Sequence, residues 1–427
     1  MLFLLLFVSH IGTFAQEVTL SLDEAVNLAM ENHLPLRRTE IDLNASGFSE
    51  RNLWSLIFPA INANASISYR NSLFSEPSSN VTNPGYSVSF GINMDLNAGI
   101  PYAMRSIRLA HQANILRYED ARNQLSILIT KRFYALIAEK NNLLLLEEIL
   151  NLTQRQLTRS ETLFRNGLIG EMALMQSRLA MENARFNLSA ARIIHDNNMT
   201  EFLGLLGMSD NENITLAGEV NIVRIDSDAE ALIREYLPLR PDIVRNRQEI
   251  ERLQNARMQT VMQSRAPSLS LSGNWNTSFS DPFSDSVTAS AGVRIPIDPL
   301  IPGTSRSQTI SAAGDSVEKA KLDLEMAENS ARTQIRSLSA LLRNSWDSIE
   351  IARLGFEVAQ RSYRLTEQGF TNGTVEALIL EDSRNNMANA RQRLLQSELS
   401  YFNMILDLSA AINVSWKDFI QIYGVPR

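Results

Sequence analysis

The chain has 427 residues and no cysteine, and its formal net charge is −7. The absence of cysteine excludes disulfides, catalytic thiolates, Cys-ligated zinc, iron–sulfur clusters and a lipid-modified cysteine. The acidic balance argues against a nucleic-acid partner.

The first residues are typical of a secretory signal peptide, which we expect over residues 1–15. The run from Met1 to Val8 is entirely apolar. Thr13-Phe14-Ala15 then places small residues at positions −3 and −1 of a cut before Gln16. A basic start is missing, and a buried N-terminal strand or helix is the alternative. No later stretch reaches the ~20 apolar residues of a transmembrane helix.

The first predicted element after the signal is a helix from Ser21 to about Phe58, interrupted at Pro35. Ser21 followed by Glu24 matches the capping box, in which each side chain bonds the other residue's backbone N–H. An apolar stripe at helical spacing follows, formed by Leu22, Ala25, Val26, Ala29 and Met30.

From Pro59 the apolar residues recur at every second position, which predicts β-strands. The alternation occurs at about 60–70, 86–96, 268–279 and 286–297, so we expect two hairpins. One face is apolar, and the other carries Ser, Asn, Gly and Thr. Arg294 belongs to the polar face, where it could tune conductance or lie near a membrane interface.

A very long helix is predicted after each hairpin, at about 102–164 and 307–368. A helix of this length would extend ~90 Å. The second one carries an apolar seam whose mean step is about 3.5 residues, the coiled-coil value. The seam residues are Val317, Ala320, Leu324, Ala327, Ala331, Ile335, Leu338, Leu342, Trp346, Ile349, Ala352, Phe356, Ala359 and Tyr363. Shorter helices follow at about 171–206 and 375–408.

The two halves of the chain are copies of one unit. Within residues 164–185, ten residues recur 206 positions later without a gap: Phe164, Asn166, Gly167, Leu174, Ser177, Arg178, Met181, Asn183, Ala184 and Arg185. We therefore expect repeat 1 at 16–208, a polar linker at 209–228, repeat 2 at 229–412 and a C-terminal tail at 413–427. The helix pairs break at 166–169 and 371–374.

The hairpins fit a membrane better than water. A soluble sandwich needs several strands close together in the sequence, whereas these hairpins are about 190 residues apart, and two strands alone are marginal in water. In a bilayer every backbone amide must be paired, so spanning strands close into a barrel. Four strands are too few to enclose a pore, so the membrane interpretation requires several subunits to share one barrel.

This order of elements resembles the TolC-like family of outer-membrane efflux proteins over essentially the whole mature chain. The resemblance implies an α+β membrane protein in which each hairpin joins a 12-stranded barrel shared by a homotrimer. Long antiparallel coiled-coil helices would continue the barrel as a periplasmic tunnel. It also implies contact with outer-membrane lipid, a periplasmic adaptor (membrane fusion) protein and an inner-membrane pump or secretion ATPase.

The family's tip signature matches both helix breaks. An aromatic, Gly-Leu and a later Ala/Ser-Arg segment correspond to Phe164, Gly167, Leu168 and Ser177-Arg178 in repeat 1. In repeat 2 they correspond to Phe370, Gly373 and Ser383-Arg384, but Thr374 replaces the leucine. The resemblance implies adaptor docking at these tips, less surely at the second. Alternatively, their apolar residues only close the turn.

Four acidic residues follow the breaks: Glu171, Glu376, Glu381 and Asp382. In a trimer, any of them that faces inward would form a ring of three, which would attract cations at a constriction. The alternative is that each is a solvated side chain that favours a helix N-terminus.

The sequence contains no catalytic or cofactor motif that we recognise. The four histidines are scattered, and neither a phosphate-binding loop with lysine nor a Gly-x-Ser-x-Gly nucleophile is present. We therefore expect no enzyme, cofactor or metal site. The leading hypothesis is a passive outer-membrane exit duct with a periplasmic helical domain. An exported structural or adhesive coiled-coil protein and a stand-alone porin are the alternatives.

Overall fold

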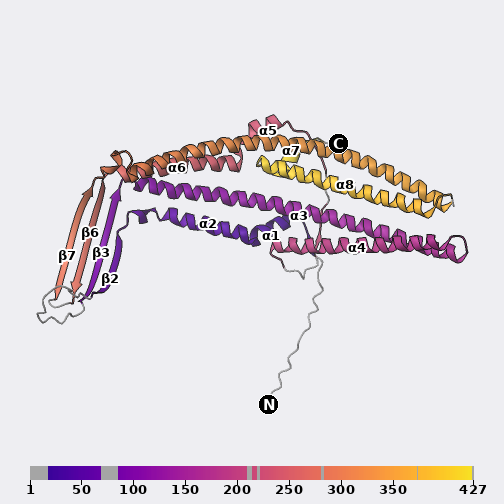
Figure 1. Cartoon of the computed structure of the whole chain (residues 1–427), viewed down its shortest axis with the longest axis horizontal. Coiled ribbons are helices and arrows are strands. Elements are labelled where there is room, and N and C mark those ends of the chain that lie inside the picture. The colour runs from indigo at the N-terminus through magenta and orange to yellow at the C-terminus, as the bar shows by residue number, and fades with distance from the viewer. Residues whose placement is uncertain are drawn as a thin grey trace, which may run out of the picture. The chain divides into compact units, whose positions relative to one another are not determined.

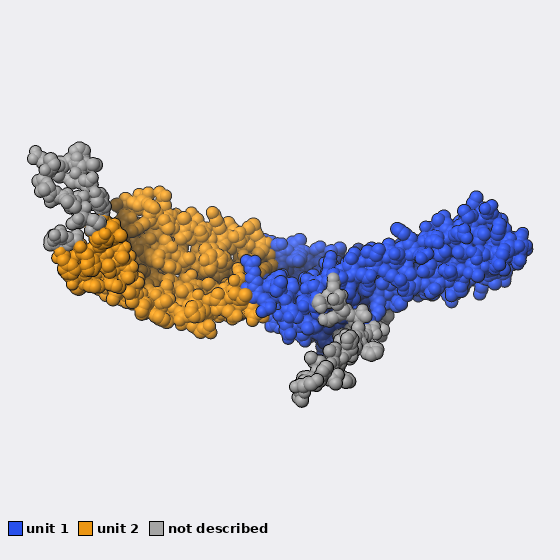
Figure 2. Space-filling model, turned by 90° about the horizontal axis from the view of Figure 1, so that it is seen from below, with its two compact units in different colours: residues 1–38, 119–241, 329–427 blue, residues 39–118, 242–328 orange. Residues whose placement is uncertain are grey.

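The computed structural model describes residues 18–68, 85–208, 214–218, 222–279, 283–372 and 374–425. The expected signal peptide and Gly373 therefore lie outside the described residues. The chain divides into two compact units (Figure 2). Unit 1 comprises residues 1–38, 119–241 and 329–427, and unit 2 comprises residues 39–118 and 242–328. The longest helices, α3 (Ile100–Arg165) and α7 (Ser305–Thr371), contribute to both units.

The helical N-terminus forms as its sequence predicts. The backbone N–H of Ser21 donates to Glu24 Oε2, and Glu24 N–H donates to Ser21 Oγ, which completes the capping box of α1 (Leu22–Asn32). Helix α2 (Leu34–Arg51) and a short 3₁₀ turn, η1 (Leu53–Leu56), follow. Helix α1 ends at His33, whose backbone is extended, and Pro35 lies in the first turn of α2, where its missing N–H removes no helix hydrogen bond.

Unit 2 contains one four-stranded antiparallel sheet in the order β2-β3-β6-β7 (Figure 1). Its strands are β2 (Ala60–Ser68), β3 (Gly85–Asn97), β6 (Ser268–Ser278) and β7 (Ser284–Arg294). The central pair, β3 with β6, joins the two repeats, which the sequence did not indicate. Strand β7 ends earlier than the predicted residue 297, because Pro296 has no N–H to donate to a ladder.

The register places the large apolar side chains of the sheet on one face. Ala63, Phe90, Trp275 and Val287 are consecutive partners across the four strands, and the Phe90 and Trp275 rings stack at 5.4 Å. The opposite face holds rows of small polar residues, with hydroxyl pairs such as Ser272–Ser290 at 2.6 Å. The apolar face is exposed: Ile67, Val287 and Val293 show 74%, 80% and 69% of their surface.

The long helices form antiparallel hairpins in unit 1. Helix α3 is followed by α4 (Glu171–Leu206), and α7 is followed by α8 (Ala377–Ala411) (Figure 1). The predicted seam of α7 is confirmed, because each of its fourteen residues is buried or partly buried. None of the described helices combines the length and the hydropathy that a membrane span requires.

An aromatic cluster forms the core of unit 1. Tyr134, Phe402 and Trp416 make edge-to-face contacts at 4.5 and 5.5 Å, and Tyr401 lies 5.3 Å from Trp346. These residues come from α3, α7, α8 and α9 (Trp416–Tyr423). Helix α9 was not predicted; it lies in the segment expected to be the C-terminal tail.

Short elements also occur where the sequence suggested a polar linker. Strand β4 (Ile214–Leu216) pairs with β1 (Val18–Leu20), and β5 (Arg224–Ile225) pairs with β8 (Gly424–Val425). Helix α5 (Ala229–Tyr236), the 3₁₀ turn η2 (Leu237–Leu239) and α6 (Pro241–Arg265) follow, and a third 3₁₀ turn, η3 (Asp298–Leu300), precedes α7. Strands of two or three residues are too short to show a period of two, so no residue pattern predicts them.

The hydroxyl of Tyr401 fixes the start of β5. It accepts from the backbone N–H of Ile225 at 2.9 Å and donates to the carbonyl of Val223 at 3.0 Å. We expect Tyr401→Phe to lower the free energy of unfolding by about 1–3 kcal/mol, because both backbone groups lose their partner. Thermal unfolding checks this, with Tyr118→Phe as the control. Equal losses in the two variants would show that the Tyr401 hydroxyl is not special.

Candidate functional site

The reversal between α3 and α4, which we call tip 1, depends on a left-handed glycine. Gly167 has φ +70°, and no atom lies within 4 Å of the place that a Cβ would occupy. The N–H of Leu168 donates to the carbonyl of Leu163 at 2.9 Å, and that of Gly167 to Phe164 at 2.9 Å. These bonds satisfy the last carbonyls of α3.

Tip 1 presents apolar side chains to solvent. Leu168 is 68% exposed, Met172 at the start of α4 is 73% exposed, and Phe164 is 39% exposed. Glu171 is exposed beside them as the first residue of α4. Tip 1 therefore has an uncovered apolar surface next to an acid.

The reversal between α7 and α8, which we call tip 2, has the same backbone hydrogen bond as tip 1 but lacks its exposed apolar surface. The N–H of Thr374 donates to the carbonyl of Gly369 at 2.9 Å, at the position equivalent to Leu168 and Leu163. The Thr374 hydroxyl donates to the same carbonyl at 3.0 Å. A polar side chain thus replaces the exposed leucine. Phe370 is partly buried, with the Arg159 guanidinium 5.1 Å from its ring centre.

A pair of serine hydroxyls joins the two helices of tip 1, and the described residues of tip 2 form no equivalent pair. In tip 1, Ser160 and Ser177 are buried and their hydroxyls lie 2.8 Å apart, which joins α3 to α4. In tip 2 the residue equivalent to Ser160 is Thr366, whose hydroxyl donates to Ser362 within its own helix. The buried hydroxyl of Ser383 is left without a hydrogen-bond partner among the described residues.

The repeated Ser-Arg motif differs even more at its arginine. Arg178 is exposed, whereas Arg384 is 4% exposed, and its Nε and Nη1 have no hydrogen-bond partner among the described residues. Glu381 lies 3.7 Å from its Nη2. Burial lowers the pKa of Arg384 and raises the pKa of Glu381, although each attracts the other's charge. Burial therefore outweighs the attraction within this pair.

A tyrosine completes the buried cluster of tip 2. Tyr363 donates to Glu367 at 3.2 Å, and burial, with the nearby Glu367 charge, raises the pKa of Tyr363 to about 12. Neither the burial of Arg384 nor this tyrosine was anticipated. Both copies of the Ser-Arg motif have the same sequence, so the motif itself does not reveal that their environments differ. The only sequence signal lies in the neighbouring positions, such as Thr366 where repeat 1 has serine.

The four acids are not equivalent. Glu171, Glu376 and Asp382 are exposed, and Glu376 precedes α8 without bonding its backbone N–H groups through its side chain. Glu381 instead turns toward Arg384. Arg294 lies far along the sequence from these residues, at the end of β7, where it pairs with Ser268 on the polar face of the sheet.

Residues 232–414 match the family model described as outer membrane efflux protein. No curated protein sequence matches the chain. The matched segment covers most of repeat 2, including tip 2.

Solved structures match nearly the whole chain. The CmeC outer membrane channel of Campylobacter jejuni is 18% identical with a TM-score of 0.75, covering 94% of this chain and 88% of its own. CusC is 17% identical with a TM-score of 0.75, covering 92% of both chains. The MtrE outer membrane channel of Neisseria gonorrhoeae is 15% identical with a TM-score of 0.72, covering 92% of this chain and 89% of its own.

Replacing both members of the Glu381–Arg384 pair should stabilise tip 2. Apolar or neutral groups of similar size remove the cost of burying charge, whereas removing one partner leaves the other uncompensated. We expect Glu381→Gln with Arg384→Met to raise the melting temperature, and Arg384→Met alone to gain less or to lose stability. Arg178→Met with Glu182→Gln, on the exposed face of α4, is the control and should change little.

The gain should depend on pH. The pKa of Glu381 is higher in the folded protein, so its proton stabilises the fold below the unfolded value of about 4.5, and this contribution is lost as pH rises through the folded pKa. The double variant lacks this dependence, so its advantage should be largest near neutral pH and shrink toward pH 4. A gain that grows on acidification would contradict the assignment.

Residues 232–414 thus carry the sequence pattern of outer membrane efflux proteins, and the described chain has the fold of solved outer-membrane channels, which confirms the resemblance to TolC-like efflux proteins that the sequence indicated.

Proposed function

We propose that the protein is the outer-membrane exit duct of a multi-component efflux or secretion system. The observation that carries the proposal is the four-stranded sheet, with its exposed apolar face and its two edge strands. Within the described residues, β2 and β7 each have only one neighbouring strand.

A single sheet of this kind leaves groups without suitable partners in water and in lipid. Large apolar side chains on one face, from Ile61 on β2 to Val293 on β7, remain exposed. The outer N–H and C=O groups of β2 and β7 need partners if they enter hydrocarbon. Strands of 9 to 13 residues suit a tilted membrane span, which is about 9–11 residues long. Closure with other copies of the chain meets both needs.

Three copies would supply twelve strands, the number that the family resemblance implies. The smallest common membrane barrels have eight strands, so one chain with four cannot close alone. The apolar face would then meet lipid, and the rows of Ser, Asn and Thr, with Arg294, would line the passage.

The tips would connect the duct to its partners in the periplasm. We assign adaptor docking to Phe164, Gly167 and Leu168 of tip 1, supported by the exposed apolar surface there. Phe370, Gly373 and Thr374 would form a second, more polar docking surface. An inner-membrane pump or secretion ATPase would drive export, because the family is one of channel proteins rather than enzymes.

Among the acids, Glu171, Glu376 and Asp382 are the better candidates for the constriction. Their exposure leaves them free to face the threefold axis, whereas Glu381 is drawn into its own hairpin beside Arg384. A ring of three carboxylates would attract cations and accept hydrogen bonds from neighbouring helices.

The pairing of β3 with β6 provides a template for the contact between copies. The hairpins correspond when Pro59 is aligned with Pro267 and Gly91 with Gly292. Ile92 pairs with Gly273 within the chain. Their equivalents are Val293 on β7 and Ala65 on β2, so Val293 should lie opposite Ala65 of the next copy.

Cysteine crosslinking tests this contact, because the natural chain has no cysteine. Ala65→Cys is combined in turn with Val287→Cys, Ala289→Cys, Ala291→Cys and Val293→Cys, all on one face of β7. We expect one combination, Val293→Cys by the template, to give a trimer that resists heat and detergent without reductant.

Combinations of Ala65→Cys with Ser286→Cys or Thr288→Cys are the controls, because those side chains lie on the opposite face. Failure of all four same-face combinations in membrane-extracted protein would contradict a ring closed by β2 and β7. A soluble monomer would instead support the exported coiled-coil alternative.

Bilayer conductance tests the duct and its constriction together. We expect a small conductance that rises in Asp382→Asn and Glu376→Gln, because neutral side chains hold neither cations nor the polar bonds that close the tip. Glu182→Gln, a neutralised exposed acid farther along α4, should leave it unchanged. Wild type without conductance would contradict the channel, and a uniform rise in all three variants would contradict the constriction.

A further inference from the structure

Two apolar segments lie exposed where the edge strands of the sheet meet the helices. The turn η1 leads into β2 and the turn η3 follows β7. The register places the start of β2 and the end of β7 at the same end of the sheet, on opposite edges. Adjacent exposed side chains of this size are typical of contact surfaces. They are Trp54, Leu56, Ile57 and Phe58 before β2, and Ile295, Ile297, Leu300 and Ile301 after β7.

The equivalent positions inside the chain are covered. The alignment of the two hairpins, continued past β3 and β7, places Ile100-Pro101 on Ile301-Pro302. After β3, Gly99 is buried, and Leu96 and Ile100 are partly buried. Their equivalents after β7 are all exposed: Leu300, Ile297 and Ile301. The same three positions are therefore covered where the two repeats meet and exposed at the outer edge of the sheet.

A side chain of the second repeat provides part of that cover. A Cβ on Gly99 would lie 2.4 Å from Cγ of Gln263 in the last turn of α6, so Gln263 packs directly on the glycine. At the outer edges of the sheet the sizes are exchanged. Leu300 stands in place of the glycine, and Ser55 stands in place of Gln263 when Pro59 is aligned with Pro267. A large side chain opposite a small one fills the space in either order.

We propose that Leu300 of one copy packs on Ser55 of the next copy, beside Trp54 and Phe58. The rings of Trp54 and Phe58 already contact each other edge to face at 5.3 Å, and each side chain is 55% exposed. The partner of this surface is a second copy of the chain. The contact rests on the proposed ring of copies and extends it beyond the strands, toward the helices. Lipid is the other apolar partner available, but lipid requires no exchange of sizes between two positions.

The exchange of sizes is tested by making the outer contact like the inner one. Ser55→Gln alone should clash with Leu300, and Leu300→Gly alone should leave a void. Each should lower the temperature at which the detergent-extracted trimer dissociates on a gel. Together they recreate the Gln263–Gly99 pair between copies, so the double variant should dissociate at a higher temperature than either single variant. Additive losses would show that the two positions act independently, as in contact with lipid, and would overturn the proposal.

Oxidative crosslinking measures the same contact without relying on stability. Ser55→Cys with Leu300→Cys should give a covalent trimer in the cysteine-free chain. Gly99→Cys with Gln263→Cys is the matched control, because that disulfide forms within one chain and leaves a monomer. Ser55→Cys with Leu322→Cys should not crosslink, since Leu322 is an exposed leucine 17 residues into α7, about 25 Å along its axis.

The outcomes separate this contact from the duct. Protein that crosslinks through Ala65→Cys and Val293→Cys but not through Ser55→Cys and Leu300→Cys would overturn this contact and leave the duct in place. A wild-type chain that is monomeric when extracted from membranes would contradict both.

Discussion

Backbone amide and carbonyl groups must find partners wherever water is excluded, and the sheet of this protein meets that requirement only in part. Its two inner strands are paired on both sides, whereas β2 and β7 each lack a second neighbour among the described residues. The apolar side chains on one face of the sheet are also exposed, so they too lack partners that would cover them. The proposed role in a membrane, the proposed ring of copies and the proposed polar passage all rest on these unfilled positions.

The helical part of the molecule is built differently, from seams and local hydrogen bonds. Helix α7 buries an alanine-rich seam, and the aromatic residues of α8 and α9 close the core of unit 1. The two tips share a backbone reversal but differ in what they bury. Tip 1 has a matched pair of serine hydroxyls, whereas tip 2 holds an arginine whose charge is poorly compensated. Identical motifs thus occupy unlike environments.

The elements with strong periodicity could be predicted from the sequence. The capping box at Ser21, the strands that begin near Ala60 and Ser268, and the seam from Val317 to Tyr363 are each set by local residue patterns. The β3–β6 pairing could not be predicted, because it joins strands about 180 residues apart and depends on how the repeats meet. Very short strands such as β5 carry no readable pattern.

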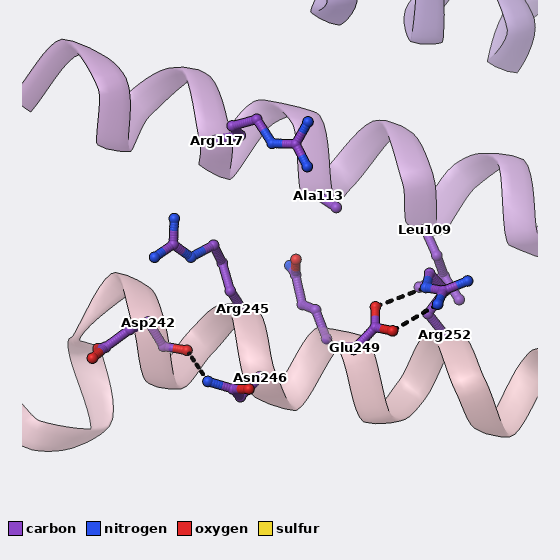
Figure 3. A pocket seen from close by; sticks show the side chains of 9 residues that line it. Leu109, Ala113, Arg117, Asp242, Arg245, Asn246, Glu249 and Arg252 are labelled. Carbon is purple, nitrogen blue, oxygen red and sulfur yellow. Dashed lines mark hydrogen bonds and ion pairs between the residues drawn. The ribbon is translucent and has the colours of Figure 1, made fainter. Parts of the chain in front are cut away.

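Of the candidate site, only the backbone reversal could be predicted from the sequence. Glycine at residue 167 indicated the positive φ that the reversal requires. The burial of Arg384 and the pairing of Glu381 with it depend on neighbouring helices, which a motif comparison within one chain does not contain. A hollow between α3 and α6 is lined by Arg117, Arg245 and Arg252, which the fold alone brings together (Figure 3).

The pairing of β3 with β6 has a consequence for assembly. Since β6 corresponds to β2 of the first repeat, the junction inside the chain is of the same kind as the one proposed between copies. In the proposed ring of three, half of the hairpin junctions would therefore already be formed when each chain has folded. A single-repeat protein would need six separate chains to meet, with the loss of translational freedom that each encounter brings. In that ring, duplication would convert half of the association events into steps of folding.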